Sequence, residues 1–349
     1  MAAYNTWRPS VDFAGPIDAE TSALLPQLYQ ALMRLGLDDP LMAIFAGISR
    51  RAWYENQLLL ASLRQLLEAL ADEQIDCVLV GEVPLVLNHF ESRHPRRIER
   101  LDIVVSSGAA RQAARLLNTA GWASDRPLTE EEIAYSHVKR FTGPNARILD
   151  LHWHFIGSAA SARVDQFFQA ARQTLPLQGV SAWHLAPEAT LIHSLLDDRS
   201  LLAAMPARWV ADELALIAGT ASAIDWNRIV AFAIETRLAS RLRRKLELLK
   251  HFGAPVPETA VARLRHAKTS LPESADWLVL NSLPRKLKYI PLRGRGVFAD
   301  YLRADRHVGQ PQGIDGFSHF VRHRWGLKGR REIPSLAARG IWRSLVSFI

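Results

Sequence analysis

The stretch "RIERLDIVVSS", Arg97 to Ser107, decides how this chain is interpreted. Apolar residues alternate around a single acid, Asp102, in the pattern of a largely buried β-strand that leads to a site. A metal-binding strand of this kind carries a second carboxylate two positions earlier, on the same face. This chain has Arg100 there. The stretch is therefore either a site strand that has lost one acid or a strand that never formed a site.

The composition is that of a globular protein without a membrane span. The chain has 349 residues, of which 48% are hydrophobic and 22% charged, and this suffices for one large domain or two to three small ones. No apolar run reaches the roughly 18–20 residues that cross a bilayer, and the N-terminus does not have a signal-peptide pattern. The single cysteine, Cys77, fits a reducing compartment. We therefore expect a cytoplasmic protein.

The order of sequence patterns predicts an α+β fold. Residues 20–73 and 185–270 have the apolar spacing of amphipathic helices. Between them, "CVLVG", "LDIVVSS" and "ARILDLHWHF" resemble short strands, with a helix in "GAARQAARLLNTAGW". We expect a mixed sheet flanked by N-terminal helices and a C-terminal helical region. The predicted units are residues 1–74, 75–180, 181–284 and 285–349.

The stretch "RILDLHWHF" presents polar side chains in a row. On a strand, Asp150, His152 and His154 point to one face, because side chains alternate. A carboxylate and two imidazoles in one row could bind a divalent metal or a phosphate. The alternative is a half-exposed strand whose polar side packs against helices.

Two neighbouring features suit an anion. Gly81 ends a strand-like run, and a glycine there lets the backbone approach a phosphate, although strand–glycine–helix junctions are common in structural roles. Downstream, "ESRHPRRIERLD" holds a basic cluster that suits a triphosphate or another polyanion, or is a solvated loop. The cluster consists of Arg93, His94, Arg96, Arg97 and Arg100.

Together these pieces resemble the polymerase-β-like nucleotidyltransferase fold. More narrowly, residues 53–257 are similar to a bacterial family of uncharacterised nucleotidyltransferases that is often found in polysaccharide-related gene neighbourhoods. That family has a Lys-Gly turn, an Arg four residues before an Asp-x-Asp strand, and a later acid-Leu-His-Trp strand. "LDIVV", "LDLHWHF", "LIHSLLDD", "ARWVADELALI" and "DWNRIVAFA" carry the resemblance.

The resemblance implies a nucleotidyltransferase-like fold and a two-metal reaction. Three carboxylates would hold two Mg²⁺ or Mn²⁺ ions, and a nucleoside monophosphate would pass from a nucleoside triphosphate to an unidentified acceptor hydroxyl. By position, the resemblance assigns catalytic and metal-binding roles to Asp102 and Asp150. His154 is expected as a further metal ligand. The residues expected to bind the nucleotide are Gly81, Glu82, Arg96, Arg97, Arg100 and His152.

The chain departs from the family at two positions. Arg100 stands where the first acid belongs, and Val80 where the turn lysine belongs. A fixed guanidinium there disfavours a metal ion. Glu82 could supply a carboxylate instead, whereas Glu99 should face the opposite side of the strand. We therefore expect either a nucleotidyltransferase or a degenerate relative that binds a nucleotide or another anion, or that serves as a scaffold.

Isolated residues are expected in structural roles. His137 and Lys139, in "YSHVKRF", could reach the site from a neighbouring strand, although a solvated edge is favoured. His193 in "TLIHSLL" is predicted to pack in a helix, and Trp209 and Trp226 are predicted to be packing anchors.

The net charge of +8 is concentrated at the C-terminal end. Residues 285–349 contain 14 Lys/Arg and 4 Asp/Glu, whereas the remainder contains 29 and 31. The interleaved Arg and aromatic residues suit RNA or an anionic membrane surface, and the segment could instead pack against its own chain. We favour docking to a protein partner or a membrane surface over binding to nucleic acid. Docking to a membrane surface would make the protein membrane-peripheral.

Overall fold

The computed structural model describes residues 2–89, 96–197, 207–268 and 313–335, together with Tyr301. Within these ranges, residues 12, 14, 16, 38, 160, 178, 221–222, 326 and 328 are not described. Most of the segment 285–349 lies outside the described residues, as do Arg93 and His94 of the basic cluster. The docking role expected of the basic segment therefore stays a prediction.

Six strands form one mixed sheet in the order β3-β4-β2-β1-β6-β5. Neighbouring strands run antiparallel in the pairs β1–β2, β3–β4 and β5–β6, and parallel in the pairs β1–β6 and β2–β4. The α+β expectation is confirmed. The strands are β1 (Cys77–Val80), β2 (Arg100–Val105), β3 (Val138–Thr142), β4 (Ile148–His152), β5 (Arg172–Leu177) and β6 (Val180–Leu185).

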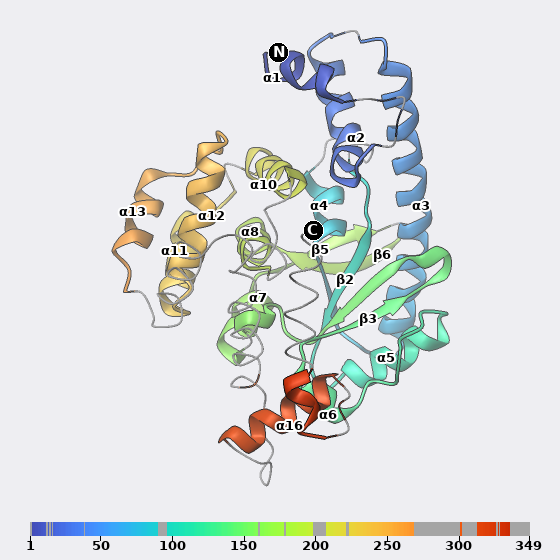
Figure 1. Ribbon diagram of the computed structural model, residues 1–349, viewed down its shortest axis with the longest axis vertical. Coiled ribbons are helices and arrows are strands. Elements are labelled where there is room, and N and C mark those ends of the chain that lie inside the picture. Colours follow the sequence, from blue (N-terminus) through green and yellow to red (C-terminus); the bar gives the residue numbers. More distant parts are fainter. Residues whose placement is uncertain are drawn as a thin grey trace.

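Helices cover both faces of the sheet (Figure 1). One face packs against α3 (Met42–Asp72) and α5 (Ala110–Thr119). The other face packs against a helical group that shares one continuous apolar core with the sheet. That group consists of α7 (Ala162–Ala170), α8 (Pro187–Leu196), α10 (Ala207–Gly219), α11 (Trp226–Glu235), α12 (Ala239–His251) and α13 (Glu258–His266).

The remaining elements lie around this core. The long helix α3 packs against α2 in an N-terminal cluster around Leu25, Leu32 and Phe45. None of the helices in the described part of the chain is long and apolar enough to cross a membrane. The other elements are α1 (Ala2–Trp7), η1 (Arg8–Ser10), α2 (Ala19–Arg34), α4 (Glu82–His89), α6 (Glu130–Tyr135), η2 (Pro144–Ala146), η3 (Gly157–Ala159) and α16 (Gly313–Trp325).

Strand alternation determines which face carries the acids. In β2, Leu101 and Ile103 belong to the core on the α3 side, so Asp102 between them points to the opposite face. In β4, Leu149 likewise points to the α3 side and Asp150 away from it. The register of the parallel pair sets Asp102 directly beside Asp150. Both acids therefore lie on the face that the C-terminal helices cover.

Several local features agree with the sequence patterns. Helix α5 ends before Gly121, whose φ of +84° lets the chain reverse. The Asp225 carboxylate caps α11 by accepting a hydrogen bond from the Arg228 N–H at 3.1 Å. The continuous helical pattern of residues 225–253 is divided at Arg237, which has a φ of +59°.

The C-terminal half of the sheet was not anticipated. Strands β5 and β6 form an antiparallel hairpin, and β6 reaches Leu185, beyond the end of the predicted 75–180 unit. Pro176, in the edge strand β5, fits the usual restriction of proline to sheet edges. The division of the chain into four units stays a prediction.

The turn between β1 and α4 is predicted to require glycine at position 81. Gly81 has a φ of +69°, and a Cβ there would lie 2.9 Å from Asp102 Oδ2. Gly81→Ala should therefore lower the free energy of unfolding by about 2–3 kcal/mol in urea titrations. Gly121→Ala is the matched control, because its φ is +84° but no atom lies within 4 Å of its Cβ position. It should cost about 1 kcal/mol. Equal losses would show that the approach to Asp102 is not constraining.

Candidate functional site

The guanidinium of Arg100 lies between the two buried acids. Its Nε is 2.8 Å from Asp102 Oδ2, 3.0 Å from Asp102 Oδ1 and 3.5 Å from Asp150 Oδ2. Asp150 also receives hydrogen bonds from Nε and a terminal nitrogen of Arg140, each at 2.9 Å. His152 Nε2 lies 3.1 Å from Asp102 Oδ1. Each acid is therefore already matched by side chains of this chain.

The electrostatics of this group follow from those contacts. Burial alone would raise the pKa of Asp102, but the hydrogen bond to His152 and the charge of Arg100 outweigh it, so the pKa is lowered. Burial opposes the charge of Arg100, yet Asp102 and its hydrogen bonds raise the pKa of the guanidinium. The buried aspartate and arginine are both charged at neutral pH.

Three side chains could hold one divalent ion. Ligand atoms of Asp102, Asp150 and His152 lie within 4.8 Å of one another. However, Arg100 Nε sits beside both carboxylates, and the position of the first acid provides no oxygen ligand. The residues therefore do not fit a pair of ions, and a single ion would require the Arg100 side chain to leave.

His154 is not brought to this group, although the sequence pattern placed it in the same row. Strand β4 ends at His152, so the alternation that would align His154 stops there. The His154 Nδ1 atom lies 2.6 Å from Asp165 Oδ2 on α7, and Asp165 Oδ1 also accepts a hydrogen bond from the Phe155 N–H. His154 therefore helps to hold the chain that leaves the sheet.

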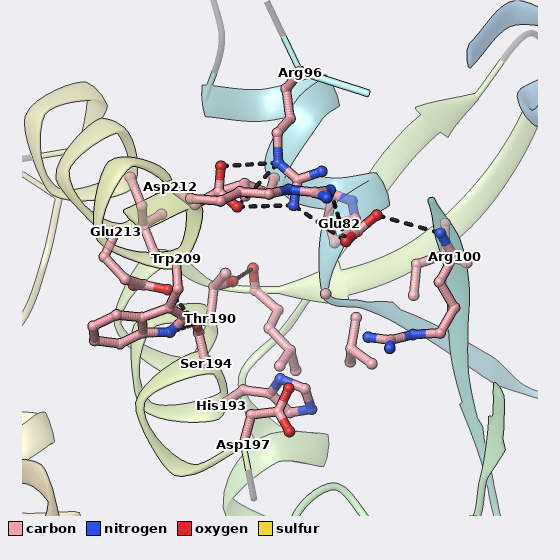
Figure 2. Close-up of a pocket in the computed structure, with 18 residues that line it drawn as sticks. Glu82, Arg96, Arg100, Thr190, His193, Ser194, Asp197, Trp209, Asp212 and Glu213 are labelled. Atoms are coloured by element: carbon pink, nitrogen blue, oxygen red, sulfur yellow. Dashed lines mark hydrogen bonds and ion pairs between the residues drawn. The ribbon is translucent and has the colours of Figure 1, made fainter. Parts of the chain in front are cut away.

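Glu82 and Arg96 join the turn after β1 to helix α10 (Figure 2). Glu82 Oε2 accepts a hydrogen bond from the Glu99 N–H at 2.6 Å, and Glu82 Oε1 is 3.2 Å from Arg96. Arg96, 3% exposed, donates to both oxygens of Asp212 at 2.8–3.0 Å. Although burial alone would raise it, the pKa of Glu82 is lowered by the charges of Arg96 and Arg208. Glu82 thus anchors the site rather than replacing the missing acid.

Arg97 points away from this group. Its guanidinium is half exposed and lies 2.7 Å from Glu55 Oε2 on α3. The backbone around it is held by the buried Asn56, whose side chain donates to the Arg96 carbonyl and accepts from the Ile98 N–H. Of the two adjacent arginines, the structure places only Arg96 at the cavity.

A cavity of about 260 Å³ lies between the β1–α4 turn and helices α8 and α10 (Figure 2). Charged lining residues include Glu82, Arg96, Arg100, Arg208 and Asp212, of which the last two belong to α10, and further polar groups come from α8 and α10. The rest of the lining is mostly apolar. The other lining residues are Leu79, Val80, Gly81, Pro84, Leu85, Leu185, Thr190, His193, Ser194, Asp197, Trp209, Glu213 and Leu216.

The lining from α8 and α10 includes His193 and Trp209, for which the sequence predicts only packing roles. His193 lines the cavity, and burial lowers the pKa of its imidazole to about 4, so the ring is neutral at pH 7. Trp209 contacts the cavity too, while Lys245 lies over its ring at 5.4 Å from the centroid. His137 stacks beside His152, whereas the buried Lys139 pairs with Asp125 and Glu132 away from the acids.

Glu213 is a buried acid that the sequence reasoning missed. It is 2% exposed, and one of its carboxylate oxygens accepts a hydrogen bond from Ser194 Oγ. Burial raises the pKa of Glu213 to about 8, the charge of Asp212 adds to the rise, and the Ser194 hydrogen bond and the charge of Lys245 oppose it. At pH 7 this side chain is mostly protonated.

Some missed residues left a signal in the sequence. Asp212 and Glu213 are adjacent acids inside the apolar "ARWVADELALIAG", and buried acids usually have a partner or a function. Arg140 has no such signal in the sequence, because its pairing with Asp150 depends on the register of β3 with β4. Arg208 also lay outside the prediction; it contacts Glu82 and Glu99 across the fold.

The chain belongs to the family described as "Uncharacterised nucleotidyltransferase", whose sequence profile matches residues 19–254. Nucleotidyltransferases as a class use nucleoside triphosphates, generally with divalent metals. Among solved structures, the chain is similar to an antigenic nucleotidyltransferase-like protein from Paracoccidioides brasiliensis, with 16% identity over 46% of this chain and 75% of that chain. The TM-score of 0.32 is too low to support an argument. No match is found among curated proteins.

Arg96 is predicted to be much more important for stability than its neighbour. Arg96→Met would leave Glu82 and Asp212 facing each other without their shared buried cation, so the free energy of unfolding should fall by about 3–5 kcal/mol. Arg97→Met is the matched control, since it removes only a half-exposed pair with Glu55, worth up to about 1 kcal/mol. Urea titrations measure both. A small loss in Arg96→Met would mean that this cluster does not hold α4 to α10.

Glu213 is predicted to make stability fall with rising pH. The folded chain keeps this proton up to about pH 8, whereas an unfolded glutamate releases it above about pH 4.5. The contribution is therefore complete below pH 4.5 and is lost as the pH rises to 8, at about 1.4 kcal/mol per pH unit. Urea titrations from pH 5 to 8 should show this extra slope in the wild type and not in Glu213→Gln. Parallel curves would contradict it.

Proposed function

We propose that this protein is a degenerate member of its family that binds a nucleotide without a metal and does not catalyse two-metal transfer. The observation that carries the proposal is the position of the Arg100 guanidinium, 2.8 Å from Asp102 and 3.5 Å from Asp150. A fixed cation beside both acids provides the charge compensation that an ion would otherwise supply. We also propose a role in a polysaccharide-related pathway, which rests on the family resemblance alone. Docking to a partner or a membrane surface is a further proposal, which rests on the charge pattern of residues 285–349.

Arg100 still has donors available for an anion. Its side-chain hydrogen bonds to described residues all run through Nε, and none through its two terminal nitrogens. Arg100 also lines the cavity. A planar guanidinium whose outer edge faces a cavity suits a phosphate oxygen, because two parallel N–H groups can bind it.

A second arginine supports an anion at the same place. Arg208 lines the cavity, and its buried Nε has no hydrogen-bond partner among the described residues. Its terminal nitrogens contact Glu82 and Glu99 at 3.1 and 2.7 Å. A buried donor without a partner costs free energy, and a phosphate bound to the Arg208 guanidinium would offset that cost.

The second candidate is the full reaction, transfer of a nucleoside monophosphate from a nucleoside triphosphate to an acceptor hydroxyl. The closeness of Asp102, Asp150 and His152 favours it, because these three could hold one ion if Arg100 moved aside. The position that Arg100 occupies in place of an acid makes us rank this candidate second.

Calorimetric titration with ATP, CTP, GTP and UTP, each with and without Mg²⁺, tests the proposal. We expect at least one triphosphate to bind the wild type without Mg²⁺. Arg100→Asp should weaken this metal-free binding by about tenfold or more, through loss of a charge-assisted hydrogen bond and added repulsion. Arg111→Asp is the matched control, because Arg111 is an exposed residue of α5 on the opposite face of the sheet. It should bind as the wild type does.

The remaining outcomes separate the two candidates. Binding that requires Mg²⁺ and is lost in Asp102→Asn would overturn the proposal in favour of the metal-assisted reaction. Absence of binding to any triphosphate would overturn both and leave a scaffold role. Metal-free binding that Arg100→Asp leaves unchanged would show that Arg100 does not contact the ligand.

A further inference from the structure

Helices α8 and α10, on the side of the cavity away from Arg100, contribute a short hydrogen-bond chain (Figure 2). Trp209 Nε1 donates to Ser194 Oγ at 3.2 Å, and Ser194 Oγ donates to Glu213 Oε1 (Figure 2). All three residues line the cavity. This hydrogen-bond chain fixes the Glu213 carboxyl group, because rotation of the group would break the contact between Oε1 and Ser194 Oγ.

The end of this chain is open. Glu213 Oε2 is buried and has no hydrogen-bond partner among the described residues. The whole side chain is 2% exposed, so bulk water does not compensate. Unpaired buried polar atoms are rare in folded proteins and commonly mark a ligand or a functional group. Because Glu213 lines the cavity, a ligand bound there is the candidate partner for this unpaired oxygen.

The surroundings of Glu213 keep it neutral. The charges that shift its pKa are Asp212 on the same helix, which favours the protonated form, and Lys245 on α12, which opposes it, while Arg208 of α10 and Asp197 also line the cavity. From α8 it faces Ser194 and the neutral His193, and across the cavity stand Glu82 and Arg96, already paired with each other. Burial dominates and raises the pKa of Glu213 to about 8. Its free oxygen thus carries a hydrogen-bond donor at pH 7.

We propose that Glu213, positioned by Ser194 and Trp209, is a binding residue for an uncharged oxygen of the ligand, a carbonyl or a hydroxyl. The subsite extends the proposed function, on which it rests only in that the anionic part of the same ligand would meet Arg100. Within one cavity, Arg100 would thus bind the anionic end of the ligand and Glu213 its neutral end. The neutral end is a nucleoside or a sugar, which share this chemistry.

The experiment uses probes without phosphate, so that Arg100 plays no part. Uridine, cytidine, adenosine, guanosine and methyl α-glucoside are titrated calorimetrically into the wild-type chain between pH 6 and pH 9. At least one probe should bind, and its affinity should fall about tenfold by pH 9, because about one tenth of Glu213 then keeps its proton. A nucleoside that binds identifies the nucleotide's own base or ribose, and the glucoside identifies an acceptor.

Three variants accompany the wild type. Glu213→Gln keeps a donor of the same shape, so it should bind the probe with no fall in affinity up to pH 9. Glu213→Leu should bind about tenfold more weakly at pH 7, since no donor remains. Glu235→Gln, an exposed glutamate on α11, should retain the wild-type pH profile. If Glu213→Leu does not fold, the comparison of the wild type with Glu213→Gln decides.

Three results would overturn the inference. One is that no uncharged probe binds the wild type. Another is that Glu213→Gln keeps the wild-type fall of affinity with pH. The third is an affinity that rises with pH, which would show that the ionised carboxylate of Glu213, accepting a hydrogen bond from the probe, is the form that binds. Because Arg100→Asp reports on the phosphate end and the Glu213 variants on the neutral end, failure of either proposal is visible separately.

Discussion

Two carboxylates side by side on neighbouring buried strands repel each other, and the site depends on how that repulsion is compensated. Oxygens of Asp102 and Asp150 lie within 4.8 Å of one another, which corresponds to about 3 kcal/mol or more at an effective dielectric constant of 20. Arg100 and Arg140 remove this cost from within the chain. Because the register of β2 with β4 sets the acids in place, the sheet itself imposes the need for these arginines.

The same principle organises the layer between the sheet and the C-terminal helices. Arg96 joins Glu82 at the start of α4 to Asp212 in α10, so a buried cation connects the turn after β1 to the wall of the cavity. Gly81 lets that turn pass close to Asp102. Glu213, one residue beyond Asp212, forms no ion pair within the described part of the chain, and burial keeps it mostly protonated at pH 7. Adjacent acids of one helix thereby have different partners, an arginine for Asp212 and a serine for Glu213.

Local patterns predicted the strands that carry the acids and the main helical regions, but not strands β5 and β6 and not the side-chain pairings. Alternation around Asp102 and Asp150 predicted both strands, the family resemblance predicted that the two acids meet, and the sequence predicted a strand–glycine–helix turn at Gly81. Arg140 and Arg208 were missed because their partners are set by strand register and by helix packing, which residue spacing does not encode. His154 was placed in the row of ligands because the end of β4 could not be located.

The arginine between the two acids gives the site a property that a bound ion cannot provide. A metal ion exchanges with the surroundings, and its occupancy follows the free concentration and the competition from other chelators. Arg100 is part of the polypeptide, so its charge is present from the moment the sheet forms and cannot be withdrawn. The charge balance at Asp102 and Asp150 is therefore encoded in the amino-acid sequence and does not vary with the supply of magnesium.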